Sequence, residues 1–182
     1  WADFYRFSMR LRDGQQVRID VSQEFDDVET AAGVAETYGF VFGQMPRVLR
    51  RGVRTMVLYP TGDDWYANTA EITIHDGNYD GELADGALEE SMIHETVHAS
   101  LDDSYAETHG WKQAQLADDG FISDYAEESP ESEDFAETFT LFYGLMMHPD
   151  RFDDETREAI LEAVPNRLAF LEKHFPASRL GL

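Results

Sequence analysis

Short runs of β-branched and alternating residues in the first half of the chain predict strands. VRIDV at residues 17–21 and RTMVLY at residues 54–59 are each bounded by turn-forming residues, which is typical of short strands. AEITIH at residues 70–75 alternates apolar and polar side chains and ends at an Asp-Gly turn. We expect this last run to be a half-exposed strand.

Two segments with helical apolar spacing accompany these strands. Residues 28–50 have this spacing, and we expect Gly43 and Pro46 to divide the segment. Residues 86–101 also predict a helix, with Asp85 as the N-cap residue.

The last third of the chain has helical periodicity. A helix is predicted to begin at Ser129-Pro130, because serine can cap a helix and proline suits its first position, and to end before Pro149. Its buried face is expected to consist of Phe135, Thr138, Phe139, Phe142 and Met146. A further helix is predicted over residues 154–174, with a kink at Pro165.

The order of these elements, strands first and helices later, is typical of the α+β class. No internal repeat or long linker interrupts the chain, so we expect a single domain over residues 1–182. Residues 1–84 would form a mixed half with a small sheet, and residues 85–182 a helical half.

Length and charge restrict the function classes. The chain has 182 residues, of which 42% are hydrophobic and 13% aromatic, enough for a packed core. Its formal net charge of −23 would repel a nucleic-acid backbone or an anionic membrane surface. No apolar run reaches the roughly 18 residues of a membrane-spanning helix. We expect a soluble protein that binds no nucleic acid.

The absence of cysteine excludes disulfides and thiolate metal sites, so histidines and carboxylates are the available metal ligands. Recurrent acidic pairs with only two lysines are typical of a solvated surface adapted to high salt. Calcium could also bind such acids, although no segment matches a calcium-binding loop with its glycine and terminal glutamate. Because the chain begins with Trp1 and not Met, either a leader or prosegment has been removed or the sequence has been trimmed, and of these we expect export and a secreted protein.

The most informative pattern is His94-Glu95-Thr96-Val97-His98, an HExxH sequence in a segment that independently predicts a helix. Residues four apart on a helix share a face, so both imidazoles can bind one zinc ion. Glu95, one position further along, can reach a water bound to that zinc. Two histidines on a solvated acidic helix are the simpler interpretation, but the helical context favours zinc.

Zinc hydrolases commonly use three protein ligands, so a third ligand is needed. The metzincin pattern would place a histidine where this chain has Ser104. His109 or the pair Asp102-Asp103 could fold back to the metal. Glu133 and Glu137 are stronger candidates, because they are four residues apart and share one face of the next predicted helix. Spacing alone does not decide between these two glutamates.

HETVH, followed by SDYAEESPESEDFAETF, resembles the gluzincin metallopeptidases of the anthrax lethal factor type. The resemblance covers about residues 88–147 and implies a zincin-like fold. It implies that His94, His98 and Glu133 are zinc ligands and that Glu95 is the general base.

The resemblance implies roles for two further residues. Tyr125 corresponds to the tyrosine that assists at the oxyanion, and Glu137 to a carboxylate that orients a ligand histidine, for which its spacing is suitable. Tyr125 precedes Glu133 by eight residues, one more than in the family pattern, so this chain has an additional residue in the loop at 127–132.

Together these residues predict a zinc-dependent endopeptidase. Glu95 would accept a proton from the zinc-bound water as it attacks a peptide carbonyl, and would pass that proton to the leaving amine. Zinc and a donor such as Tyr125 would stabilise the oxyanion. A protein or peptide substrate is expected to lie along the edge of the sheet, for which residues 70–75 are the best candidate, centred on Ile72, Thr73 and Ile74.

Two other function classes fit part of the sequence. A catalytically silent zinc-binding interaction module would keep the histidines, but it would have no need of Glu95. An acidic decoy that mimics nucleic acid would suit the net charge, but it does not explain the HExxH helix.

Overall fold

The computed structural model describes residues 3–181, and only the backbone of Asp85. The chain divides into two compact units, residues 1–100 and residues 101–182. The first contains the sheet, and the second is helical. The boundary follows Ser100, so the helix with the HExxH sequence belongs to the same unit as the sheet.

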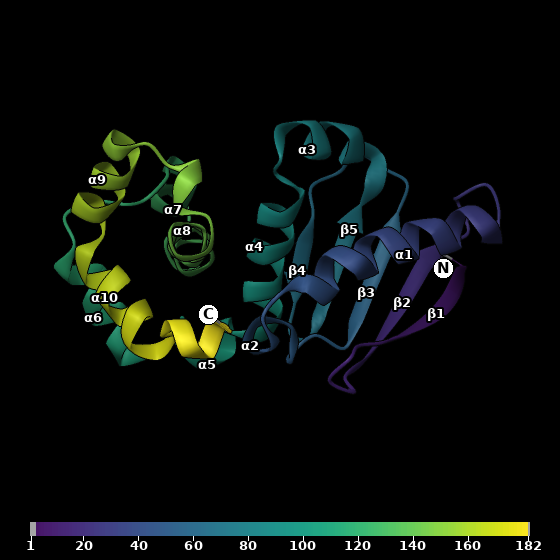
Figure 1. The fold of residues 1–182 in the computed structure, drawn as a ribbon, viewed down its shortest axis with the longest axis horizontal. Helices are drawn as coiled ribbons and strands as arrows, with labels where there is room; N and C mark the ends of the chain where they lie inside the picture. Colours follow the sequence, from purple (N-terminus) through teal and green to yellow (C-terminus); the bar gives the residue numbers. More distant parts are fainter. Residues whose placement is uncertain (1–2, 182) are drawn as a thin grey trace. The chain divides into compact units, whose positions relative to one another are not determined.

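The first unit is built on a five-stranded mixed sheet of strand order β1-β2-β3-β5-β4 (Figure 1). The two outer pairs, β1 with β2 and β4 with β5, are antiparallel, whereas β2 with β3 and β3 with β5 are parallel. The strands are β1 (Phe4–Arg10), β2 (Gln16–Ser22), β3 (Thr55–Tyr59), β4 (Tyr66–Asn68) and β5 (Glu71–His75). All three predicted strands are present, as β2, β3 and β5.

The expectation that residues 70–75 form the edge of the sheet is wrong. Strand β5 lies between β3 and β4, so its backbone pairs on both sides. Three successive residues of β5 are buried, namely Ile72, Thr73 and Ile74. Because successive side chains of a strand point to opposite faces of the sheet, both faces of the sheet are covered at β5. Among the described strands, the edges are β1 and β4.

Helices α1 (Val28–Gln44) and α2 (Arg47–Arg50) follow β2. The Asp27 side chain caps α1 by accepting a hydrogen bond from the Thr30 N–H. Helix α1 continues through Gly43 and the chain turns at Pro46, so only the predicted division at proline is confirmed. Helix α1 contacts β1 and β2 and lies across one face of the sheet (Figure 1).

The segment after β5 contains two helices where one was predicted. A 3-10 turn, η1 (Asp76–Asn78), leads into α3 (Tyr79–Asp85), which ends at Gly86. Gly86 has a φ of 71°, a left-handed conformation that glycine adopts without strain. Helix α4 then runs over Leu88–Ser100, so Asp85 ends the preceding helix and the predicted start at residue 86 is wrong.

The second unit consists of short helices around an aromatic core. Trp111 packs edge-to-face on Phe135 with ring centroids 4.8 Å apart, and Phe139 packs likewise on Phe175 at 5.0 Å. The helices are α5 (Asp102–Tyr105), α6 (His109–Ala117), α7 (Asp124–Glu128), α8 (Asp134–Met147), η2 (Pro149–Arg151), α9 (Asp154–Ala163), α10 (Pro165–His174) and α11 (Ala177–Leu180).

Two predicted helix boundaries in this unit are wrong. Helix α8 begins at Asp134, because residues 130–133 form a turn after α7. The helix predicted over residues 154–174 is interrupted at Val164, and Pro165 starts α10 in place of bending one long helix. None of the helices within residues 3–181 is both long enough and apolar enough to cross a membrane.

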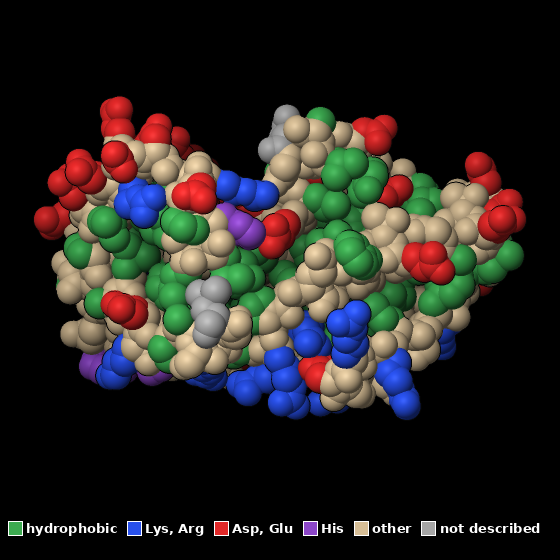
Figure 2. All heavy atoms as spheres, in the orientation of Figure 1, with side chains coloured by type: hydrophobic (Ala, Val, Ile, Leu, Met, Phe, Trp, Pro, Cys, Tyr) green, Lys and Arg blue, Asp and Glu red, His purple; other side chains and the backbone are tan. Residues whose placement is uncertain are grey.

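Charge is unevenly distributed along the chain. The first 54 residues contain eight arginines and eight acidic residues, so the formal charge of −23 comes from residues 55–182. At one end of the sheet, Asp13 forms ion pairs with Arg47 and Arg50 at 3.5 and 2.9 Å. Acidic groups are prominent elsewhere on the surface in Figure 2.

Candidate functional site

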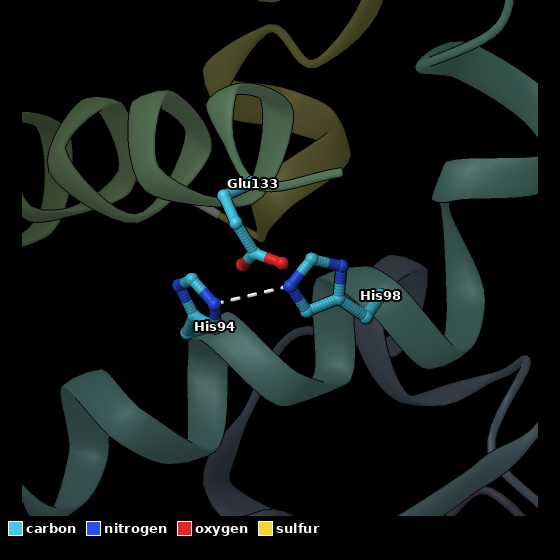
Figure 3. A group of neighbouring side chains, drawn as sticks. All are labelled: His94, His98 and Glu133. Carbon is cyan, nitrogen blue, oxygen red and sulfur yellow. Dashed lines mark hydrogen bonds between the residues drawn. The ribbon is translucent and has the colours of Figure 1, made fainter. Parts of the chain in front are cut away.

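His94 and His98 lie one turn apart on α4, and their side chains point toward each other (Figure 3). Their Nε2 atoms are 3.0 Å apart, and the rings are nearly perpendicular with centroids 4.7 Å apart. In the absence of a cation, one ring would donate a hydrogen bond to the other. Two Nε2 lone pairs at this separation can equally face one metal ion.

The opposite face of α4 anchors this histidine pair to the first unit. Met92 and Val97 are fully buried, and α4 contacts β4 and β5 of the sheet. Thr96 is also fully buried, and its hydroxyl donates to the sulfur of Met45 at 3.6 Å. The apolar face of α4 therefore fixes the rotation of the helix and the direction in which its histidines point.

The C-terminal end of α4 is held by two backbone contacts. The Ala99 carbonyl accepts a hydrogen bond of 2.9 Å from the N–H of Ala70, in the turn between β4 and β5. Gly52 passes so close that an added Cβ would lie 2.8 Å from the Cα of Ser100. Both the C-terminal end of α4 and its buried face are thus fixed within the first unit.

Glu95 lies between the two histidines in sequence, and only 8% of its surface is exposed. A carboxylate in such a protected position can exchange a proton with a bound water while little bulk solvent reaches it. The residue types and order on α4 therefore suit metal binding next to a general base.

Glu133, in the second unit, immediately precedes α8. Its N–H donates to the Ser129 carbonyl at 2.8 Å, and its own carbonyl accepts from the N–H of Glu137 at 2.9 Å. Glu133 and Glu137 are half-buried and one turn apart, as their spacing predicts. Glu133 is the last residue of the turn at 130–133 and does not lie inside a helix.

Glu137 is joined to the helix that contains Tyr125. The Ser123 hydroxyl donates to the Glu137 carboxylate at 2.7 Å and accepts from the N–H of Ala126 at 3.1 Å, which caps α7. Tyr125 lies in the first turn of α7 and has 52% of its surface exposed. Its hydroxyl-bearing ring is therefore accessible to a ligand.

Among the described residues, His94, His98 and Glu133 form a group that could hold a metal ion, with one ligand atom from each (Figure 3). Zinc bound by two imidazoles at about 2.0–2.1 Å in tetrahedral geometry separates their nitrogens by about 3.3 Å. The observed 3.0 Å between the two Nε2 atoms is close to that value. Two imidazoles and one carboxylate are also the ligand set of a common class of zinc hydrolase.

The alternative third ligands do not belong to this group. His109 is exposed at the first position of α6, and Asp102 and Asp103 lie in the short helix α5.

Sequence reasoning missed the groups that hold the turn before α8, chiefly Gln115 and Arg167. Arg167 is fully buried and forms ion pairs with Asp118 and Asp134. A single arginine or glutamine in an amphipathic helix gives no signal of burial or of a distant partner, so no pattern in the sequence could have identified them.

Comparison of the chain with protein-family models gives no match, and searches against curated proteins and solved structures give no significant similarity. Function must therefore be inferred from the residues of this chain.

Proposed function

We propose that this protein is a zinc-dependent endopeptidase of the gluzincin type, with His94, His98 and Glu133 as the zinc ligands. The observation that carries the proposal is the HExxH histidine pair, in which two Nε2 atoms face each other at 3.0 Å from one face of a helix. The ability of these two histidines and Glu133 to hold a metal ion as a group supports it.

The proposed chemistry assigns separate tasks to the metal and to Glu95. Bound zinc lowers the pKa of water to near neutrality and polarises a carbonyl. Glu95 accepts the proton of the attacking water and then donates it to the amine nitrogen of the leaving peptide. Protection of Glu95 from solvent supports this role, because few other water molecules compete for its carboxylate.

Tyr125 and Glu137 would complete the machinery. Tyr125 would donate its hydroxyl proton in a hydrogen bond to the oxyanion, and its exposed position in α7 permits contact with a substrate. Glu137 would accept a hydrogen bond from the second ring nitrogen of a ligand histidine. The bond from Ser123 restrains the Glu137 carboxylate, which supports a fixed orienting role.

The substrate would lie along the edge strand β4, and not along β5. In the described sheet, β4 (Tyr66–Asn68) pairs on one side only, with β5, and it contacts α4. An extended peptide could add to its outer side through backbone hydrogen bonds. The substrate class that follows is an extended segment of a protein or peptide.

The test compares Glu95→Gln with Glu90→Gln, which removes an exposed carboxylate from the same helix. We expect wild type and both variants to bind about one zinc per chain, and Glu95→Gln alone to lose at least about 100-fold of its activity on casein. Full activity in Glu95→Gln would contradict the proposal. Zinc binding by a wild type without proteolysis would indicate a silent zinc module, and absence of zinc would favour a decoy.

A further inference from the structure

Arg167, like its ion-pair partner Asp134, is a charged residue with no exposed surface. Its Nε donates to Asp118 at 3.0 Å, and its two terminal nitrogens donate to Asp134 and to the carbonyl of Gly120. The guanidinium also lies over the ring of Phe121, 5.0 Å from its centroid. Each of its three nitrogens therefore has an acceptor, and one face has an aromatic ring, all within the second unit.

Asp118 fixes the position of this arginine on α10. One carboxylate oxygen of Asp118 accepts from the backbone and side-chain nitrogens of Asn166, both at 2.8 Å. The other oxygen accepts from the backbone N–H and the Nε of Arg167. Asp118 ends α6, so the end of α6 and the start of α10 are locked together.

Gln115 joins the same assembly to the turn that contains Glu133. Its side-chain amide donates to the carbonyl of Pro130 at 2.9 Å and to Asp134 at 2.9 Å. Pro130 begins the turn at 130–133, and Asp134 is the residue directly after it. One amide group therefore holds both ends of the turn.

A buried ion pair of this kind contributes little net stability, because desolvation offsets the attraction between the charges. Its effect is to permit few alternative positions for the groups it connects. The turn at 130–133 is restrained in this way, at its first residue by Gln115 and just beyond its last residue by Gln115 and Arg167.

We propose that Gln115 and Arg167 are positioning residues that fix the carboxylate of Glu133 for metal binding. This inference rests on the proposed function, since it assumes that Glu133 is a ligand. Loosening the turn would leave the ligand present but displaced, and metal affinity and coordination geometry would change while the fold persists.

The experiment compares Gln115→Glu with Gln113→Glu. Both variants add one negative charge to α6 at nearly the same place, but Gln113 is exposed, whereas Gln115 is half-buried and faces two acceptors. Replacing the donor amide of Gln115 with a carboxylate turns both of its hydrogen bonds into repulsive contacts. Gln115→Ala, which removes the amide without adding charge, is the second variant at this position.

Zinc affinity and the visible absorption spectrum of the cobalt-substituted protein are measured for all four proteins. We expect both Gln115 variants to bind zinc about 10–100-fold more weakly and to show an altered cobalt spectrum, whereas Gln113→Glu matches wild type. Circular dichroism should show the native helix content in each. A merely structural role of Gln115 would lower the melting temperature and leave the cobalt spectrum of the folded protein unchanged.

Wild-type affinity and spectrum in folded Gln115→Glu and Gln115→Ala would overturn the positioning role while leaving the proposed function intact. A wild-type protein that binds neither zinc nor cobalt would overturn both proposals. Arg167→Lys provides a further check, because a single ammonium cannot reproduce the contacts of the guanidinium with three separate acceptors.

Discussion

The Ser123 hydroxyl donates a hydrogen bond of 2.7 Å to the Glu137 carboxylate and also caps α7. One small side chain therefore connects the first turn of α7 to the first turn of α8. Tyr125 lies in that turn of α7, so its position depends on the same contact as the orientation of Glu137.

The first prediction concerns this connection. Ser123→Ala removes both the cap and the bond to Glu137, and we expect a loss of about 0.5–2 kcal/mol in the free energy of unfolding. Proteolytic kcat should fall as well, if Tyr125 and Glu137 act as proposed. Urea denaturation and steady-state kinetics measure the two effects. Ser123→Thr keeps a capping hydroxyl, so it should retain most of the stability and most of the kcat of wild type. Equal losses in Ser123→Ala and Ser123→Thr would contradict this explanation.

The second prediction concerns the close approach of Gly52 to the end of α4. A methyl group there would lie 2.8 Å from the Cα of Ser100, so Gly52→Ala should destabilise the protein by about 1–3 kcal/mol. Gly33, inside α1, has nothing within 4 Å of the corresponding position, so Gly33→Ala should stabilise by about 0.5–1 kcal/mol. Urea denaturation should show a lower free energy of unfolding than wild type for Gly52→Ala and a higher one for Gly33→Ala.

The third prediction concerns acid stability. Burial tends to raise the pKa of Asp118, but hydrogen bonds from Asn166 and Arg167 outweigh burial and lower that pKa below its ordinary value. As the pH falls, the Asp118 carboxylate is therefore protonated at a higher pH in the unfolded chain than in the folded protein. The stabilisation from Asp118 is present above about pH 4 and is lost as the pH falls through the folded pKa.

Asp118→Asn tests this contribution, because it removes the titrating carboxylate of Asp118 and leaves every other acidic residue in place. We expect the stability difference between wild type and Asp118→Asn to be largest at neutral pH and to shrink below about pH 4. Urea denaturation over a pH series measures this difference. A difference that grows on acidification would show that the Asp118 pKa is not lowered in the folded protein.

The fourth prediction concerns salt. Residues 55–182 carry the whole net charge of −23, so like-charge repulsion should destabilise the folded protein at low ionic strength. We expect the melting temperature to rise between about 0.01 and 0.15 M sodium chloride, over which the Debye length falls from about 30 to about 8 Å. A flat or falling melting temperature would indicate that ion pairs or bound cations already neutralise the acidic groups.

The sequence was sufficient to predict the features that depend on local periodicity. The positions of β2, β3 and β5 followed from short apolar runs, and the placement of His94 and His98 on one helical face followed from their spacing. Strand β1 was missed although Tyr5, Phe7 and Met9 alternate with more exposed residues. That pattern was visible in the sequence and could have been recognised.

Features that depend on long-range pairing could not be predicted. The order of strands within a sheet is set by tertiary contacts, so alternation in residues 70–75 could not show that β4 would cover the edge of β5. The partners of Arg167 lie 33 and 49 residues away in sequence, and no local pattern connects them. The break at Val164 was signalled by Pro165, but the choice between a kink and a new helix depended on the capping contacts of Asp118.

The most direct test of the central claim is a competitive zinc titration of wild type, Glu133→Ala, Glu137→Ala and His109→Ala. We predict tight binding of one zinc by wild type and His109→Ala, a loss of about 10–100-fold in Glu137→Ala and a much more severe loss in Glu133→Ala. His109 is exposed and lies outside the metal-binding group, so His109→Ala is the matched control. Tight zinc binding that persists in Glu133→Ala but is lost in His109→Ala would contradict the gluzincin assignment.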